Sequence, residues 1–140
     1  MYRHAIACIA LLAPTATTAS EALIYAAIYE CHADEINQDL ARICSDTFPA
    51  MSSDAADALS KWRSRNSIRA QQEKDSCENE LHEKERSARK SETETVRGKI
   101  SNGMDEIRQG LFANLKSRGK DFCIEALHQL AVGSGAVDIK

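Results

Sequence analysis

The sequence predicts an all-α protein, an antiparallel bundle of three or four helices with one long charged helix and two disulfides. Its 140 residues contain only two prolines, Pro14 and Pro49. No run of alternating β-branched residues is typical of a strand. Apolar side chains instead recur three, four and seven positions apart in three successive segments, as they do along one face of a helix. The length fits a single domain.

Residues 1–19 have the pattern of a cleaved export signal. A polar start with Arg3 precedes the apolar run 5–13, and Pro14 and small residues follow it up to a cleavage site after position 19. The alternative is a retained membrane anchor, since residues 5–29 contain a single formal charge and could cross a bilayer. Pro14 and the threonine cluster after it favour cleavage.

The remaining chain is acidic and keeps an even number of cysteines. The full chain has a net charge of −3, which becomes −4 once Arg3 leaves with the signal. An acidic domain without a basic stripe is unsuited to binding nucleic acid. Together with the signal, the paired cysteines predict a periplasmic or secreted protein that has no membrane association after cleavage. The four remaining cysteines are Cys31, Cys44, Cys77 and Cys123.

The first expected helical segment extends to the region of Pro49. Apolar side chains recur at helical spacing from Ile24 to Cys44. Pro49 disfavours helix at Phe48, and the serines that follow, starting with Ser52, can cap the next helix. We therefore expect a turn within the stretch SDTFPAMSSD.

A long polar helix is expected next, from Asp54 to Val96, with a thin apolar stripe. Two glycines in RGKISNG, residues 97–103, predict the second turn. A stronger apolar stripe begins at Ile100 and resumes past Gly119. The helical domain is expected to cover residues 20–132, with a flexible tail over 133–140.

Two cysteine–histidine pairs suggest a metal site at first sight. Cys77 precedes His82 by five residues, and Cys123 precedes His128 by the same spacing. Residues five apart on a helix diverge by roughly 140°, given ~3.6 residues per turn, so neither pair can chelate one ion. The short cysteine spacings of structural zinc sites are also missing. We expect no metal, no cofactor and two disulfides.

The predicted hairpin suggests how the cysteines pair. Folding the chain back at the second turn places Cys77 level with Cys123, within the reach of a disulfide. Cys31 would then pair with Cys44, which requires a break in the first helix; the sequence CHADE, with Asp34 as a cap, can provide it. Other pairings, such as Cys31 with Cys77, require the first hairpin to slip by several turns.

Trp62 and Asn66 lie one turn apart on the apolar stripe of the long helix. With Arg63 and Arg65 beside them, they form a candidate partner-binding site, because Trp and Arg are enriched at interface hot spots. The alternative is a core tryptophan whose polar neighbour is satisfied inside the protein.

The stretch CHADEINQDLARICSD, followed by a helix with WRSR, resembles the LprI-type lysozyme-inhibitor domain. The matching positions are Cys31, Ile43, Cys44, Trp62 and Arg65. The resemblance implies a loop closed by Cys31 and Cys44, and inhibition of a cell-wall hydrolase. The sequence is also similar to small exported helical proteins of bacteria.

Catalytic motifs are missing from the sequence. There is no G-x-S-x-G, H-E-x-x-H or glycine-rich phosphate loop, and paired cysteines are not nucleophiles. We therefore expect a protein that is not an enzyme and binds another protein, as a stoichiometric inhibitor of a cell-wall hydrolase or an immunity protein against one. The alternative is a structural or stress-related envelope protein that self-associates, for example as a homodimer.

Overall fold

The computed structural model describes residues 19–87, 90–133 and 137–139. The predicted export signal, apart from its last residue, lies outside these ranges. Within the described ranges, no helix combines the length and the apolar character needed to span a bilayer.

The predicted all-α fold is confirmed. Four α-helices and one short 3-10 helix follow each other in the described residues, and α3 is the long charged helix that the sequence predicts. The elements are α2 (Ala19–Thr47), η1 (Pro49–Met51), α3 (Ser52–Ser87), α4 (Lys90–Arg118) and α5 (Lys120–Val132). Two disulfides cross-link them, as expected.

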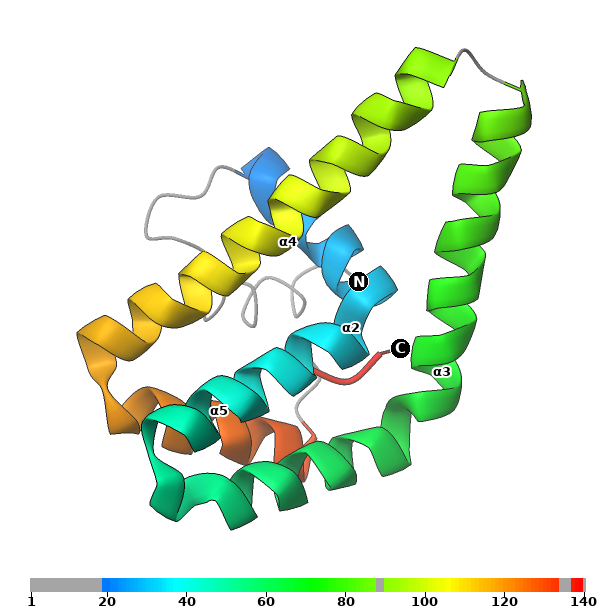
Figure 1. The fold of residues 1–140 in the computed structure, drawn as a ribbon. Helices are drawn as coiled ribbons and strands as arrows, with labels where there is room; N and C mark the ends of the chain where they lie inside the picture. Colours follow the sequence, from blue (N-terminus) through cyan, green and yellow to red (C-terminus); the bar gives the residue numbers. More distant parts are fainter. Residues whose placement is uncertain (1–18, 88–89, 134–136, 140) are drawn as a thin grey trace.

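The helices form a closed end and an open end (Figure 1). At the closed end, α5 and the second half of α2 pack against the first half of α3. At the open end, the second half of α3 and the first half of α4 approach each other only near their tips, and the first half of α2 lies between them (Figure 1). The fold therefore leaves two long helical arms with little direct contact between them.

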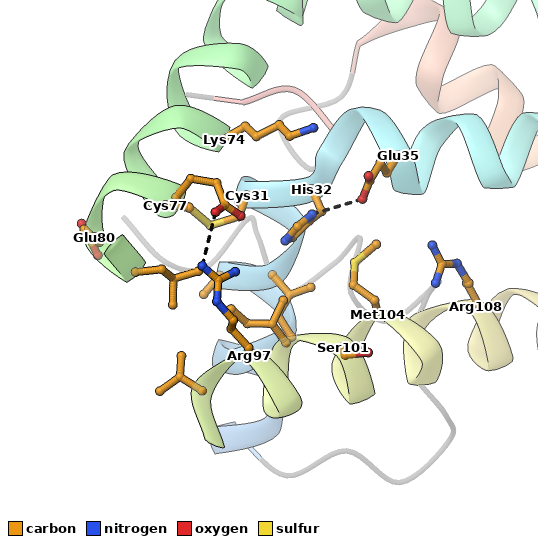
Figure 2. Close-up of a pocket in the computed structure, with 16 residues that line it drawn as sticks. Cys31, His32, Glu35, Lys74, Cys77, Glu80, Arg97, Ser101, Met104 and Arg108 are labelled. Carbon is orange, nitrogen blue, oxygen red and sulfur yellow. Dashed lines mark hydrogen bonds and ion pairs between the residues drawn. A yellow bond between two sulfur atoms is a disulfide. The ribbon is translucent and has the colours of Figure 1, made fainter. Parts of the chain in front are cut away.

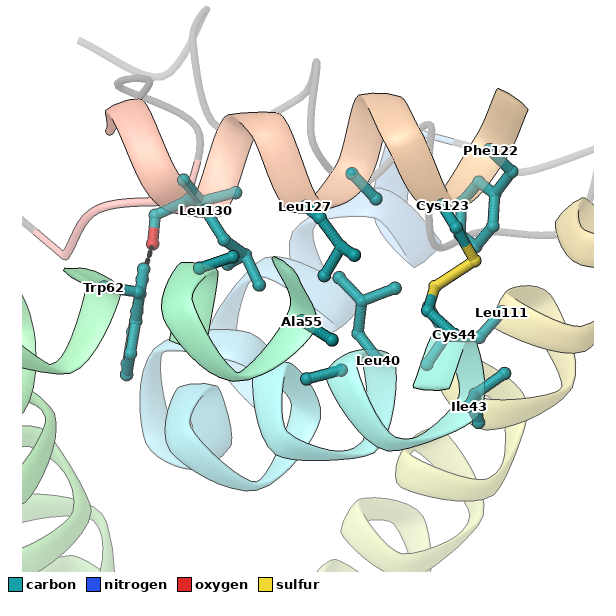
Figure 3. Close-up of a cluster of buried hydrophobic side chains, with 14 of the residues drawn as sticks. Leu40, Ile43, Cys44, Ala55, Trp62, Leu111, Phe122, Cys123, Leu127 and Leu130 are labelled. Carbon is teal, nitrogen blue, oxygen red and sulfur yellow. Dashed lines mark hydrogen bonds between the residues drawn. A yellow bond between two sulfur atoms is a disulfide. The ribbon is translucent and has the colours of Figure 1, made fainter. Parts of the chain in front are cut away.

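The hydrophobic core occupies the closed end (Figure 3). Trp62, Phe122, Leu111 and Leu130 are its largest fully buried side chains. Among the side chains described beyond Ala70 in α3, only that of Leu81 is buried. The thin apolar stripe of α3 therefore fills the core in its first half and leaves its second half mostly solvated.

Two predicted breaks in the helices are confirmed. Helix α2 is kinked at His32, where φ is −128° and ψ is 23°, within the sequence CHADE. The turn before Pro49 has a non-helical Phe48, with φ −128° and ψ 82°, and α3 begins at Ser52. Proline acts as expected at this turn, because it restricts the residue before it and can begin a new helix.

The predicted second turn in residues 97–103 is wrong. Gly98 and Gly103 both lie inside α4. Helix α3 instead ends at Ser87 and α4 begins at Lys90, while the next break falls at Gly119, which has a positive φ of 59°. A glycine costs a helix only about 1 kcal/mol relative to alanine, so packing can keep it helical.

The shift of this turn also makes the predicted disulfide pairing wrong. Cys31 is bonded to Cys77, with 6.0 Å between their Cα atoms, and Cys44 is bonded to Cys123, with 5.7 Å. Because α3 ends at Ser87 and α4 begins at Lys90, Cys77 lies opposite the first half of α4, and Cys123 belongs to the separate helix α5. Cys77 and Cys123 therefore lie in different halves of the molecule.

Substitution by alanine should change the free energy of unfolding in opposite directions at Gly98 and Gly103 of α4. A Cβ at Gly98 would meet nothing within 4 Å, so Gly98→Ala should raise the free energy of unfolding by about 0.5–1 kcal/mol through helix propensity. A Cβ at Gly103 would lie 2.2 Å from Cδ1 of Ile28, which must move. Gly103→Ala should therefore lower the free energy of unfolding by about 1 kcal/mol, since overpacking outweighs propensity. Urea unfolding of both variants checks this, and equal stabilisation would show that α2 and α4 are not so close.

The end of the chain is docked, so the prediction of a flexible tail over 133–140 is wrong for residues 137–139. Val137 and Ile139 are each 7% exposed. Trp62 Nε1 donates a hydrogen bond of 2.7 Å to the carbonyl of Val137, and the amide of Ile139 donates one of 3.0 Å to Asn66 Oδ1. These bonds hold the chain end against α3. Residues 134–136 and 140 lie outside the described ranges.

Candidate functional site

Trp62 and Asn66 lie inside the protein, so the predicted partner-binding site does not form a surface. Trp62 is 0% exposed and Asn66 is 2% exposed. Asn66 Nδ2 donates hydrogen bonds to the Trp62 carbonyl at 3.0 Å and to Asp138 Oδ1 at 2.8 Å. The alternative interpretation, a core tryptophan with a satisfied polar neighbour, is the one that the structure shows.

Arg63 and Arg65 join elements rather than forming one patch. Arg63 donates two hydrogen bonds to the carboxylate of Asp34, at 2.7 and 2.9 Å, and so ties α3 to α2 just past the kink. Arg65 donates to the carbonyls of Leu130 and Ala131, which end α5. Carbonyls in the last turn of a helix lack helical partners, so Arg65 caps α5.

A cavity of the described structure lies at the open end, between α2, α3 and α4 (Figure 2). We call it the open-end groove; its volume is about 460 Å³. Its apolar lining comes from all three helices: Ala27, Ile28, Leu81, Val96, Ile100 and Met104. Charged side chains surround this lining: His32, Glu35, Lys74, Glu78, Glu80, Arg97 and Arg108. An apolar floor with a polar rim is the usual composition of a binding site.

The Cys31–Cys77 disulfide is part of the groove wall (Figure 2). It joins α2 at its kink to the second half of α3, and both cysteines are partly exposed. The kink at His32 turns the first half of α2 between the arms, which brings Cys31 within reach of Cys77. The groove is thus covalently fixed on one side.

The rim of the groove carries ionisable side chains of both signs, and two pairs of them lie close together. His32 Nδ1 lies 3.2 Å from Glu35 Oε2, and a guanidinium nitrogen of Arg97 lies 3.8 Å from Glu78 Oε2. These partly exposed pairs contribute little to stability, because water screens them. Their mixed signs favour a partner with polar and charged groups around an apolar centre.

Arg108 links the groove to the body of the protein through Asp39, at 2.7 Å. Burial raises the pKa of the Asp39 carboxyl, but hydrogen bonds from Arg108 and Arg42 and their positive charges outweigh burial and hold this pKa below its ordinary value. Because the pKa is lowered in the folded state, the stabilisation is present at neutral pH and is lost as the pH falls through the lowered pKa.

A smaller cavity of about 270 Å³ lies on the other side of the kink, between α2 and α3. It shares Cys31, His32, Glu35 and Lys74 with the open-end groove. Its own walls include the Asp34–Arg63 ion pair, which is 2.7 Å long. The kinked turn of α2 therefore lines both hollows, and Cys31 of the disulfide belongs to both.

Metal-binding geometry is not found in the described part of the chain. No group of three or more His, Cys, Asp or Glu side chains there is placed to hold an ion. His82 approaches Glu78 Oε2 at 4.0 Å, on the exposed side of α3. His82 and Cys77, whose spacing raised the question of a metal pair, thus have separate partners.

The sequence did not single out the groove, because its walls come from three helices far apart in the chain. Leu81, Ile100 and Met104 were visible as stripe positions. Nothing in their spacing shows that the arms diverge and that these side chains line a groove between them. Comparison with protein families, curated proteins and solved structures finds no match for this chain.

Proposed function

We propose that the protein is an exported, non-enzymatic protein that binds another protein through the open-end groove. The observation that carries this proposal is the groove itself, an apolar floor from three helices inside a charged rim. Specific interfaces commonly have an apolar centre and a polar rim. A rigid, preformed site also lowers the entropy cost of binding, and the Cys31–Cys77 disulfide supplies rigidity here.

The disulfides indicate a non-reducing environment. Both bonds join helices distant in the sequence, with separations of 46 and 79 residues. Such structural disulfides persist in secreted and periplasmic proteins and are rare in a reducing cytosol. Location in the bacterial periplasm is part of our proposal, in agreement with the export signal that the sequence predicts.

A cell-wall hydrolase is the partner that we propose, with the protein as its stoichiometric inhibitor or as an immunity protein against it. An enzyme that acts on the anionic cell wall is expected to present a basic surface. The acidic chain, with a net charge of −3, would complement such a surface and speed association. The resemblance to the LprI-type inhibitor domain points to the same class of partner.

Titration of cell-wall hydrolysis tests this proposal. A muramidase, a lytic transglycosylase and an amidase would each be titrated with the oxidised protein while the clearing of a cell-wall suspension is followed. We expect one enzyme class to lose activity linearly up to a one-to-one ratio. Ile100→Asp, which puts a charge on the groove floor, should weaken inhibition at least tenfold.

Ile124→Asp is the matched control, because Ile124 is 51% exposed on α5 and does not line the groove. It should inhibit like the unchanged protein. Equal loss in both variants would place the binding surface elsewhere, and no inhibition of any class would contradict the hydrolase as partner.

Self-association is the second candidate function. Ile68 on α3 is 75% exposed, the highest value among the exposed large apolar side chains described, and is available for a helix–helix contact between two copies. A dimer in sedimentation velocity that Ile68→Asp dissociates, together with no hydrolase inhibition, would favour this alternative.

A further inference from the structure

The two disulfides occupy different environments. Cys44 and Cys123 are each 0% exposed and lie within the hydrophobic core (Figure 3). Cys31 and Cys77 are partly exposed and line the open-end groove (Figure 2). A thiolate must reach a sulfur atom to attack it, so access differs between the two bonds.

The two disulfides also differ in what else holds the helices that they join. Around Cys44–Cys123, the packed core keeps α2 and α5 together. Around Cys77, the part of α3 beyond Ala70 has Leu81 as its one buried side chain among those described. The Arg97–Glu78 ion pair across to α4 is 3.8 Å long and partly exposed. Cys31–Cys77 is therefore the main tie of this arm.

We propose that Cys31–Cys77 is a site of thiol–disulfide exchange, at which a dithiol reductant releases the second half of α3 and opens the groove. Cys44–Cys123 stays oxidised and keeps the core folded. Cys44–Cys123 thus stabilises the closed end, while Cys31–Cys77 controls whether the open end stays closed over the groove. The inference does not rest on the identity of the groove's partner.

The dithiol reductant supplies the two electrons that the exchange requires. One thiolate of the dithiol attacks Sγ of one cysteine, which forms a mixed disulfide and expels the other cysteine as a thiolate that then takes up a proton. The second thiol of the reductant loses its proton and attacks the mixed disulfide, releasing the first cysteine as a thiolate, which is protonated in turn. The reductant leaves as a disulfide, and the protein has gained two electrons and two protons.

Opening follows from the loss of the tie. Without the covalent bond, the described side chains of the arm contribute the burial of Leu81 and partly exposed ion pairs, and segments with few buried contacts open locally at low free energy. The groove then loses the wall that α3 provides, which is one of its three walls. Any ligand that needs the closed groove would then bind more weakly.

Graded reduction of the native protein tests the first step. The oxidised protein would be exposed to dithiothreitol for increasing times, quenched by alkylation and mapped by peptide mass spectrometry. We expect Cys31 and Cys77 to be alkylated at least about tenfold faster than Cys44 and Cys123. Equal rates, or earlier labelling of Cys44 and Cys123, would overturn the proposal.

Hydrogen exchange of the selectively reduced protein tests the second step. Amide protection should fall at least about tenfold in residues 71–83 and 96–102 and remain in residues 36–47 and 120–130. The Cys31→Ser/Cys77→Ser variant, which cannot reoxidise, should show the same pattern. Unchanged protection in the arms, or loss of protection throughout, would each contradict a local opening.

Discussion

Replacing Cys44 and Cys123 together by alanine is expected to lower the free energy of unfolding by about 4.5 kcal/mol. The bond joins residues 79 positions apart, and loop-closure entropy for that length gives about this value. Whole small domains are stabilised by only about 5–15 kcal/mol, so the variant should be close to unfolding at room temperature. Urea unfolding followed by circular dichroism measures the change.

The matched control is Cys31→Ala/Cys77→Ala. Chain entropy for its separation of 46 residues predicts a loss of about 4 kcal/mol, nearly the same. The structure predicts a loss below about 2 kcal/mol, because the released arm gains freedom in the folded state and offsets the gain in the unfolded state. Equal losses in the two double variants would contradict the distinction between the closed and open ends.

The local breaks of the chain could be predicted from the sequence because each rests on neighbouring residues. Pro49 ends the first helical segment through its fixed backbone angle and its effect on Phe48. A break in CHADE was expected only because a Cys31–Cys44 disulfide would need one; that pairing is wrong, so the kink at His32 agrees with the expectation but not with its reason. Periodicity alone sufficed for the all-α class, since helical spacing is a local property.

The second turn could not be predicted, because packing there overrides propensity. Gly98 and Gly103 look like a turn in sequence but stay helical within α4. Helix α3 ends at Ser87 and α4 begins at Lys90, and the sequence SARK over 87–90 contains neither glycine nor proline. A displacement of about twelve residues in a helix is about 18 Å, which is enough to exchange every disulfide partner.

The sequence contains a signal that the end of the chain docks beside Trp62. Asn66 shares the apolar stripe with Trp62, and a buried amide needs partners that a bare helix face cannot offer. The alternation Val137, Asp138, Ile139 supplies them, with two apolar side chains for the core and polar groups for Asn66. An unsatisfied polar position on an apolar stripe could thus have indicated that another segment docks there.

Trp62→Ala is expected to lower the free energy of unfolding by about 3–5 kcal/mol, since it removes the largest fully buried side chain of the core. The Val137 carbonyl also loses the indole donor at 2.7 Å and keeps the Tyr29 hydroxyl as a donor at 2.9 Å. Tyr29 in turn accepts from Asn37, so the loss affects a network that joins α2, α3 and the chain end. Chemical denaturation measures the change.

Trp62→Phe separates packing from hydrogen bonding and decides between the two interpretations of Trp62. It keeps most of the apolar volume but removes the indole donor, so we expect a smaller loss of about 1–2 kcal/mol and faster hydrogen exchange at Ile139. Because Trp62 is 0% exposed, this variant should still inhibit a hydrolase as the unchanged protein does, while Ile100→Asp should not. Loss of inhibition by a Trp62→Phe protein that is still folded under the assay conditions, with inhibition retained by Ile100→Asp, would instead assign the partner-binding role to Trp62 and not to the groove.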